Sequence, residues 1–368
     1  MVKSSLKEEN GVKKLNVAII GQGRSGRNIH GAYFKSEKNV NYQVVAVVEW
    51  DPARRELALE EYPGCQVYED YAELYQRDDI DLVVNSTYSN EHYAVTKDLL
   101  EHGKNVVVEK PFARNRYECD CLMKLAKENN VVLAVYQNSF FATFYEETKK
   151  LIEKGTIGTI EQINIRYSGF ARRWDWQTSQ VRMGGNLYNT GPHPVGLALG
   201  FLDFDPEYKV AFSKLAKTEF SSGDSDDYVK IILTAPGKPV VDLEINSDDA
   251  YTDYNLKLYG SRGTYKCTLT DYKMQYFVPE ENEERPLVLD PLKDEEKMPV
   301  YCREELVKHE EEGKYVGGPF EKGSADFYQM VYEKITLDKP MSITPEHAAM
   351  IIEVIETVHA ENRLQLKF

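Results

Sequence analysis

The first third of the chain alternates short apolar runs with longer segments whose apolar residues recur at helical spacing. The run at 15–20 is nearly continuous, as is typical of a parallel strand buried on both faces. The alternation then continues, with strands predicted at 44–48, 65–68, 81–84, 105–108 and 131–136, and helices at 52–61, 71–77, 93–102 and 116–129. Strands separated by helices of this length predict a parallel sheet covered by helices on both faces.

Beyond Tyr136 the pattern changes to alternating apolar and polar positions, which is typical of antiparallel strands. Strands are predicted at 163–167, 228–234, 240–245, 256–259 and 265–269, and helices at 144–154, 325–337 and 345–362. Polar and glycine-rich stretches between them are predicted to be turns at 220–227 and 261–263 and solvated acidic loops at 279–286 and 308–318. We therefore place a domain boundary near Tyr136.

Three glycines follow the first strand at the spacing of the G-x-G-x-x-G fingerprint. Gly21 permits a sharp turn, Gly23 lets a pyrophosphate approach the backbone, and Gly26 lets the next helix pack close to the strand. An ordinary glycine-rich turn has the same letters, so the context decides. Glu49 ends the second strand, and such units place an acid on the adenosine ribose about 20 residues beyond the turn. Together these features predict a dinucleotide site.

Glu49 also bears on the choice of cofactor. Its carboxylate would accept hydrogen bonds from the ribose hydroxyls and would repel a 2′-phosphate. We therefore expect NAD rather than NADP, although Arg24 and Arg54 lie close enough in sequence to keep NADP an alternative.

Composition narrows the class of protein. The chain has 368 residues, which suits two domains of ordinary size. Its 45 basic and 60 acidic side chains give a net charge of -15, so we expect neither a nucleic-acid partner nor an anionic membrane surface. No run approaches the ~18 apolar residues of a membrane span. Residues 1–14 lack the apolar core of a secretory signal and are predicted to be a flexible lead-in.

The five cysteines form no Cys-x-x-Cys pair. An odd count without that spacing indicates reduced thiols rather than a disulfide framework or a zinc site. We therefore expect a cytoplasmic protein and no metal.

Several motifs together carry a resemblance to a known family. They are GQGRSG at 21–26, Ser86-Thr87 followed by His92, HGKNVVVEKPFA at 102–113, LIEKGTIG at 151–158 and GGNLYNTGPHP at 184–194. The chain resembles the Gfo/Idh/MocA oxidoreductases, a group of sugar, inositol and glycoside dehydrogenases. The resemblance implies an open sheet in the second domain that builds a homodimer or homotetramer, with a carbohydrate or polyol held between the domains.

The predicted fold class is thus α/β. Residues 1–136 form a Rossmann dinucleotide-binding domain, and residues 137–368 form an α+β substrate and oligomerisation domain with a large, predominantly antiparallel open sheet. In such parallel sheets, ligands bind beyond the carboxyl ends of the strands. We expect the cofactor to contact residues of those loops, namely Gly21, Gly23, Arg24, Ser25, Gly26, Glu49, Ser86, Thr87, His92, Glu109 and Lys110.

Lys110 and His193 are the predicted catalytic residues. Oxidation of a secondary alcohol needs a base on the hydroxyl beside the hydride acceptor. Lys110 follows a strand end, and its pKa would fall beside a nicotinamide cation, whereas a bare Glu-Lys-Pro triplet is more often a surface lysine. An imidazole titrates near neutral pH, although a lone His is more often structural. We predict a structural role for His92, which would hold the loop under the cofactor.

Asn189 departs from the family pattern, because relatives commonly carry Asp four residues before this His. Residues four apart share one face of a helix, so Asn189 is predicted to position the imidazole of His193. It cannot supply the charge that stabilises an imidazolium. His193 is therefore expected to be a weaker base than in relatives, and Lys110 is expected to carry more of the proton transfer.

The segment 170–180 is predicted to form a wall of the substrate site. Trp174 and Trp176 offer flat faces that suit sugar rings, and Arg172 offers hydrogen bonds to hydroxyls, as do its neighbours Arg173, Asp175 and Gln177. An aromatic cluster at the domain interface explains the same residues equally well.

The sequence therefore predicts an NAD-dependent dehydrogenase acting on a secondary hydroxyl of a sugar, glycoside or cyclic polyol. One alternative is an enzyme that keeps NAD bound, oxidises a glycoside transiently and eliminates the aglycone. Another is a cofactor-binding regulatory protein. The presence of both Lys110 and His193 and the net negative charge of the chain argue against it.

Overall fold

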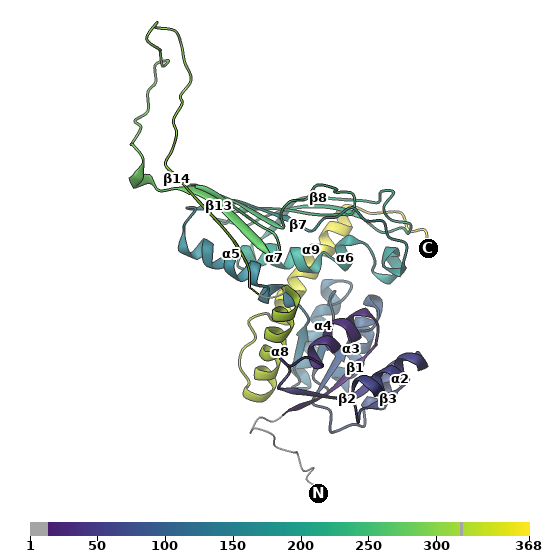
Figure 1. The fold of residues 1–368 in the computed structure, drawn as a ribbon. Helices are drawn as coiled ribbons and strands as arrows, with labels where there is room; N and C mark the ends of the chain where they lie inside the picture. The colour runs from purple at the N-terminus through teal and green to yellow at the C-terminus, as the bar shows by residue number, and fades with distance from the viewer. Residues whose placement is uncertain (1–13, 317–318) are drawn as a thin grey trace.

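The computed structural model describes residues 14–316 and 319–368 and arranges them around two sheets (Figure 1). The predicted lead-in lies outside the described residues, apart from Lys14. The first sheet has six parallel strands in the order β3-β2-β1-β4-β5-β6. These strands are β1 Leu15–Ile20, β2 Tyr42–Val48, β3 Gln66–Tyr68, β4 Leu82–Asn85, β5 Val106–Val108 and β6 Leu133–Val135.

The first sheet matches the predicted Rossmann arrangement. Its order reverses between β1 and β4, which creates a crevice at their carboxyl ends. The helices of this part are η1 Gly26–His30, α1 Gly31–Phe34, α2 Pro52–Glu61, α3 His92–Glu101 and α4 Arg116–Glu128. The helix predicted at 71–77 is wrong, because only a short 3-10 turn, Tyr71–Leu74, forms there.

The second sheet has eight strands in the order β14-β13-β12-β11-β7-β10-β9-β8. Only β7 and β10 pair in parallel, so the predicted mostly antiparallel sheet is confirmed. Its strands are β7 Ile160–Arg166, β8 Lys209–Ala216, β9 Tyr228–Thr234, β10 Val240–Asn246, β11 Leu256–Gly260, β12 Gly263–Cys267, β13 Asp271–Phe277 and β14 Lys308–Lys314.

The pattern of the sequence missed β8, β13 and β14. The loop predicted at 308–318 is wrong over Lys308–Lys314, which pairs with β13 at the edge of the sheet, while 317–318 lie outside the described residues. Most side chains of β14 are exposed, so this acidic edge strand shows no apolar alternation.

Helices of the second part cover one face of the eight-stranded sheet (Figure 1). They are α5 Thr143–Lys154, α6 Asn186–Asn189, α7 Pro192–Phe201 and α9 Pro345–Glu361. The sequence did not predict α7, because nine of its ten residues are buried and it has no polar stripe.

Helix α8, Pro319–Leu337, begins earlier than the predicted 325 and returns to the first sheet. Phe327, Tyr328 and Val331 are buried in the same core cluster as Tyr42 of β2. The last third of the chain therefore stabilises the nucleotide-binding part. Within 14–316 and 319–368, no helix is long and apolar enough to cross a membrane.

Candidate active site

The glycine turn after β1 has the geometry of a pyrophosphate site. Gly21 has φ +89°, a backbone conformation that favours glycine. A Cβ on Gly26 would lie 1.8 Å from the carbonyl oxygen of Gly21, whereas a Cβ on Gly23 would meet nothing within 4 Å. The turn is thus closed on its inner side at Gly26 and open at Gly23, where a phosphate would approach the backbone.

Glu49 lies buried at the end of β2, beside this turn. Its Oε2 accepts a hydrogen bond from the Gln22 amide at 2.7 Å, and its Oε1 accepts one from the Asp51 amide at 3.1 Å. Arg54 Nη1 is 3.7 Å from Glu49 Oε2, and Arg54 also pairs with Asp51. The carboxylate is therefore fixed next to the glycine turn, where it fits a ribose diol.

Buried polar contacts join the loop after β4 to the end of β1 and to the loop after β5. Ser86 Oγ donates to the carbonyl oxygen of Ile20 at 2.6 Å. His92 Nδ1 lies 2.7 Å from the carbonyl oxygen of Pro111, and its Nε2 lies 3.3 Å from that of Thr87. Burial lowers the pKa of His92, and its ring lies between carbonyl oxygens of the two loops, one of which accepts the single N–H of the neutral form.

Lys110 links the six-stranded sheet to the helices that cover the eight-stranded sheet. Its Nζ donates a hydrogen bond of 2.7 Å to the carbonyl oxygen of Asn189, and its backbone amide donates to Glu109 Oε2 at 2.9 Å. Glu109 Oε1 lies 3.1 Å from His30 Nε2, and His30 Nδ1 lies 2.6 Å from the hydroxyl of Tyr328. A buried chain of polar groups thus runs from α8 to Lys110.

The environment of Lys110 lowers its affinity for a proton, chiefly through burial. Burial lowers the pKa of Lys110, the charges of Arg24 and Arg173 act in the same direction, and Glu109 opposes them. Burial and the charge of Lys110 also lower the pKa of His193, to about 3. The imidazole is therefore neutral at pH 7.

Glu109 shows the opposite balance. Burial alone would raise its pKa, but the hydrogen bond with His30 and the attraction to His30 and Lys110 outweigh burial and lower the pKa to about 2. The carboxylate consequently remains ionised beside Lys110.

His193 and Asn189 do not form the predicted pair. Helix α6 ends at Asn189 and α7 begins at Pro192, so the two residues do not share one helix face. Asn189 Oδ1 accepts from Gln177 Nε2 at 3.0 Å, and His193 Nδ1 lies 3.3 Å from Ser139 Oγ. Among the hydrogen bonds of the described residues none joins Asn189 to His193, and the carbonyl of Asn189 holds Lys110 instead.

The predicted substrate wall divides into two parts. Trp176 packs edge-on against Tyr88 of the first part of the chain, with ring centroids 5.0 Å apart. Arg173 donates a hydrogen bond to Gln177, and Gln177 in turn donates one to Asn189. Arg172 and Trp174 are exposed, with Trp174 78% exposed.

Three residues that hydrogen-bond to Glu109, His30 or His193 were not predicted from the sequence to belong to the site. They are His30, Ser139 and Tyr328. His30 follows Gly26 by one helical turn, so both face the sheet, and a buried imidazole there needs polar partners. This spacing could have identified His30. Ser139 and Tyr328 reach the site through tertiary packing, and no local pattern marks them.

Two family models match the chain. The oxidoreductase family model with an NAD-binding Rossmann fold matches residues 15–137. The GFO/IDH/MocA C-terminal domain matches residues 145–266. Together the two matches cover most of both sheets.

Among curated relatives, the chain is similar to scyllo-inositol 2-dehydrogenase (NADP(+)) IolW of Bacillus subtilis, with 29% identity over 230 residues. That alignment covers 62% of this chain and 62% of IolW, so it spans less than two thirds of the relative. The chain is also 26% identical over 266 residues to 2,7-anhydro-N-acetylneuraminate hydratase of Mediterraneibacter gnavus, covering 71% of this chain and 69% of the relative.

Among solved structures, an NAD-binding protein from Listeria innocua superposes with a TM-score of 0.78 at 20% identity. The superposition covers 95% of this chain and 98% of that chain, which shows that the two share a fold.

Proposed function

The chain belongs to the Gfo/Idh/MocA oxidoreductase family, and from this membership we propose that it oxidises a secondary hydroxyl of a sugar, glycoside or cyclic polyol with NAD. The observation that carries the proposal is the meeting of Lys110 and His193 beyond the glycine turn. Lys110 Nζ is held at the carbonyl of Asn189, and its charge acts on the imidazole of His193.

The cofactor fits the residues that are present. The backbone at Gly23 and the helix that follows would hold the pyrophosphate, and Glu49 would hold the adenosine ribose. When bound, the nicotinamide supplies the hydride acceptor. The carboxylate of Glu49 favours NAD, and because IolW is named as an NADP enzyme, both cofactors belong in the test.

Lys110 is the principal proton-transfer group in this proposal. Its lowered pKa favours the neutral amine, which is the form that can accept a proton from the substrate hydroxyl. The Nζ atom would orient the substrate hydroxyl and accept or relay its proton. Because Asn189 offers a backbone carbonyl, it holds Nζ in place without adding a charge.

His193 has a supporting role. A neutral imidazole with a pKa of about 3 is a weak base, so His193 would accept a hydrogen bond from the substrate and pass a proton on only after Lys110 has moved it. Arg173, Gln177 and Trp176 would form the side of the site that faces the sugar ring.

A second candidate is an enzyme that oxidises its substrate transiently, eliminates a leaving group and then returns the hydride. The similarity to 2,7-anhydro-N-acetylneuraminate hydratase favours it, because a hydratase causes no net oxidation. The same Lys110 and His193 would serve both reactions.

One experiment separates the two candidates. The protein is incubated with NAD or NADP and a panel of sugars, inositols and aryl glycosides, while NADH absorbance and release of the aglycone are followed together. A dehydrogenase gives one NADH for each ketone formed. Aglycone or a dehydrated product without net NADH would support the second candidate, and no reaction with any cofactor would contradict both.

A further inference from the structure

An arm of the chain, residues 279–307, joins β13 to β14 and projects away from both sheets (Figure 1). Its two limbs are held together by few contacts. Arg285 Nε lies 3.0 Å from Glu304 Oε1, and at the tip the amide of Asp294 donates to the carbonyl of Met298 at 3.0 Å. The arm therefore has no core of its own.

Large apolar side chains nevertheless lie along the arm. Leu287 is 85% exposed, Leu289 is 88% exposed and Tyr301 is 92% exposed. Exposed apolar side chains that lie close together mark an interaction site more often than a free surface. The arm therefore has the composition of a segment that docks against a partner.

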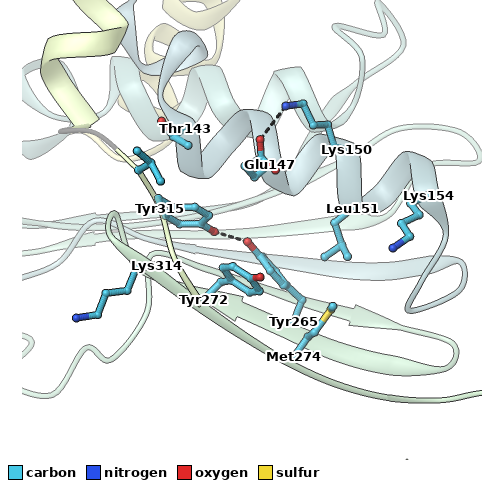
Figure 2. Close-up of a pocket in the computed structure, with 11 residues that line it drawn as sticks. Thr143, Glu147, Lys150, Leu151, Lys154, Tyr265, Tyr272, Met274, Lys314 and Tyr315 are labelled. Carbon is cyan, nitrogen blue, oxygen red and sulfur yellow. Dashed lines mark hydrogen bonds and ion pairs between the residues drawn. The ribbon is translucent and has the colours of Figure 1, made fainter. Parts of the chain in front are cut away.

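A pocket lies between α5 and the β12-β13-β14 end of the second sheet (Figure 2). This α5–sheet pocket has a volume of about 490 Å³. Leu151 of α5 faces Tyr272 and Met274 of β13 across it. Thr143 Oγ1, which also lines the pocket, is buried and has no hydrogen-bond partner among the described residues.

The charges of the arm and the pocket are complementary. Residues 279–307 carry ten acidic and four basic side chains. The charged side chains that line the pocket are three lysines and one glutamate, namely Lys150, Lys154, Lys314 and Glu147. Lys150 pairs with Glu147 at 2.7 Å, whereas the ion pairs of the described residues include none for Lys154 or Lys314.

The geometry of the hairpin separates the arm from the pocket of its own chain. The arm leaves between Phe277 and Lys308, whereas the pocket lies near Tyr272 and Lys314, at the other end of the same two strands. Strands of seven residues span roughly 20 Å, and the arm continues outward from the far end. A second copy of the chain carries the same pocket, whose lysines and apolar side chains complement the arm.

We propose that the arm of one copy docks in the α5–sheet pocket of a second copy, and that two copies exchange arms about a two-fold axis. Leu287 and Leu289 would fill the apolar floor of the pocket. The acidic residues on either side of them, Glu283, Glu284 and Asp290, would face the lysines of the pocket. A two-fold exchange buries both arms and both pockets at once.

The test is a charge swap measured by sedimentation velocity and native mass spectrometry. One variant reverses the arm (Glu283→Lys, Glu284→Lys, Asp290→Lys), and the other reverses the pocket (Lys150→Glu, Lys154→Glu, Lys314→Glu). Each variant alone should raise the dimer dissociation constant at least about tenfold, because like charges then meet. Mixing the two should restore a heterodimer, since each arm then meets a pocket of opposite charge.

A matched control reverses three lysines of α3 and α4, namely Lys97, Lys124 and Lys127, and should leave association unchanged. The proposal is overturned by a wild-type chain that remains monomeric at tens of micromolar, by swap variants that dimerise like the wild type, or by a mixture that fails to form the heterodimer.

A second measurement identifies the occupant of the pocket and does not depend on charge. In a Cys302→Ser background, one copy carries Leu287→Cys and an affinity tag, and the other carries Lys154→Cys. A disulfide between the two copies after mild oxidation supports arm exchange. A disulfide that forms only when one chain carries both cysteines, or no disulfide in either case, contradicts it.

Discussion

Replacement of Glu109 by Gln tests the buried polar chain that supports Lys110. Glu109 is 3% exposed, and both of its oxygens face donors, one at the Lys110 amide and one at His30. Glutamine keeps the size of the side chain but has one acceptor oxygen, so its NH₂ group must face one of these donors.

The expected magnitude follows from the pKa. A carboxyl whose pKa falls from 4.5 in the unfolded chain to about 2 in the folded one contributes about 3 kcal/mol to the free energy of unfolding at pH 7. Because the folded pKa is depressed, this contribution is fully present above pH 4.5 and is lost as the pH falls toward 2. Glu109→Gln should therefore lower stability equally at pH 7 and pH 5.5, and by less at pH 4.

Urea unfolding followed by circular dichroism at the three pH values measures this difference. Glu37→Gln, a change of an exposed carboxylate, is the matched control and should alter stability by less than about 0.5 kcal/mol. A loss under about 1 kcal/mol at pH 7, or a loss that grows as the pH falls, would refute the reasoning. Since Glu109 raises the pKa of Lys110, the same variant should also move the acidic limb of the oxidation rate to lower pH.

Three further predictions concern the cofactor and the base. Glu49→Ala should reduce the preference for NAD over NADP, and isothermal titration with both cofactors checks it; unchanged selectivity contradicts the role of Glu49. Gly26→Ala should weaken cofactor binding at least about tenfold, because its Cβ would lie 1.8 Å from the Gly21 oxygen, and undiminished affinity would exclude this turn as the site. Asn189→Asp should raise the pKa of Lys110 and move the acidic limb of the oxidation rate to higher pH, because Nζ binds the backbone carbonyl of this residue and a carboxylate on the same residue adds a negative charge that favours the ammonium. The shift of the acidic limb should persist in Asn189→Asp/His193→Gln. If the shift disappears in the double variant, Asn189→Asp acts through His193 and not through Lys110.

The sequence predicted those parts of the fold that depend on local patterns. Buried parallel strands such as β1 are continuous apolar runs, and the roles of Gly21 and Gly26 follow from backbone geometry that only glycine allows. The pattern failed where burial or exposure is uniform. Helix α7 is buried all round, and β14 is exposed along most of its length, so neither shows the period of its structure.

The residues that hold Lys110 in place were harder to predict, because they meet only through tertiary contacts. His30 and Tyr328 lie almost 300 residues apart and meet only when α8 returns to the first sheet. The spacing of Asn189 and His193 suggested a shared helix face, but the chain breaks the helix between them and the amide binds Gln177.

The most direct test of the central claim uses the best substrate of the panel, deuterated at the carbon that bears the reacting hydroxyl. The reduced cofactor is isolated and its deuterium content is measured by NMR, with the wild type and Lys110→Met compared. The account predicts deuterium on the nicotinamide ring and a rate that falls about 10² to 10⁴ in Lys110→Met, with NAD affinity retained. Reduced cofactor without deuterium, or a variant that keeps the wild-type rate, would contradict it.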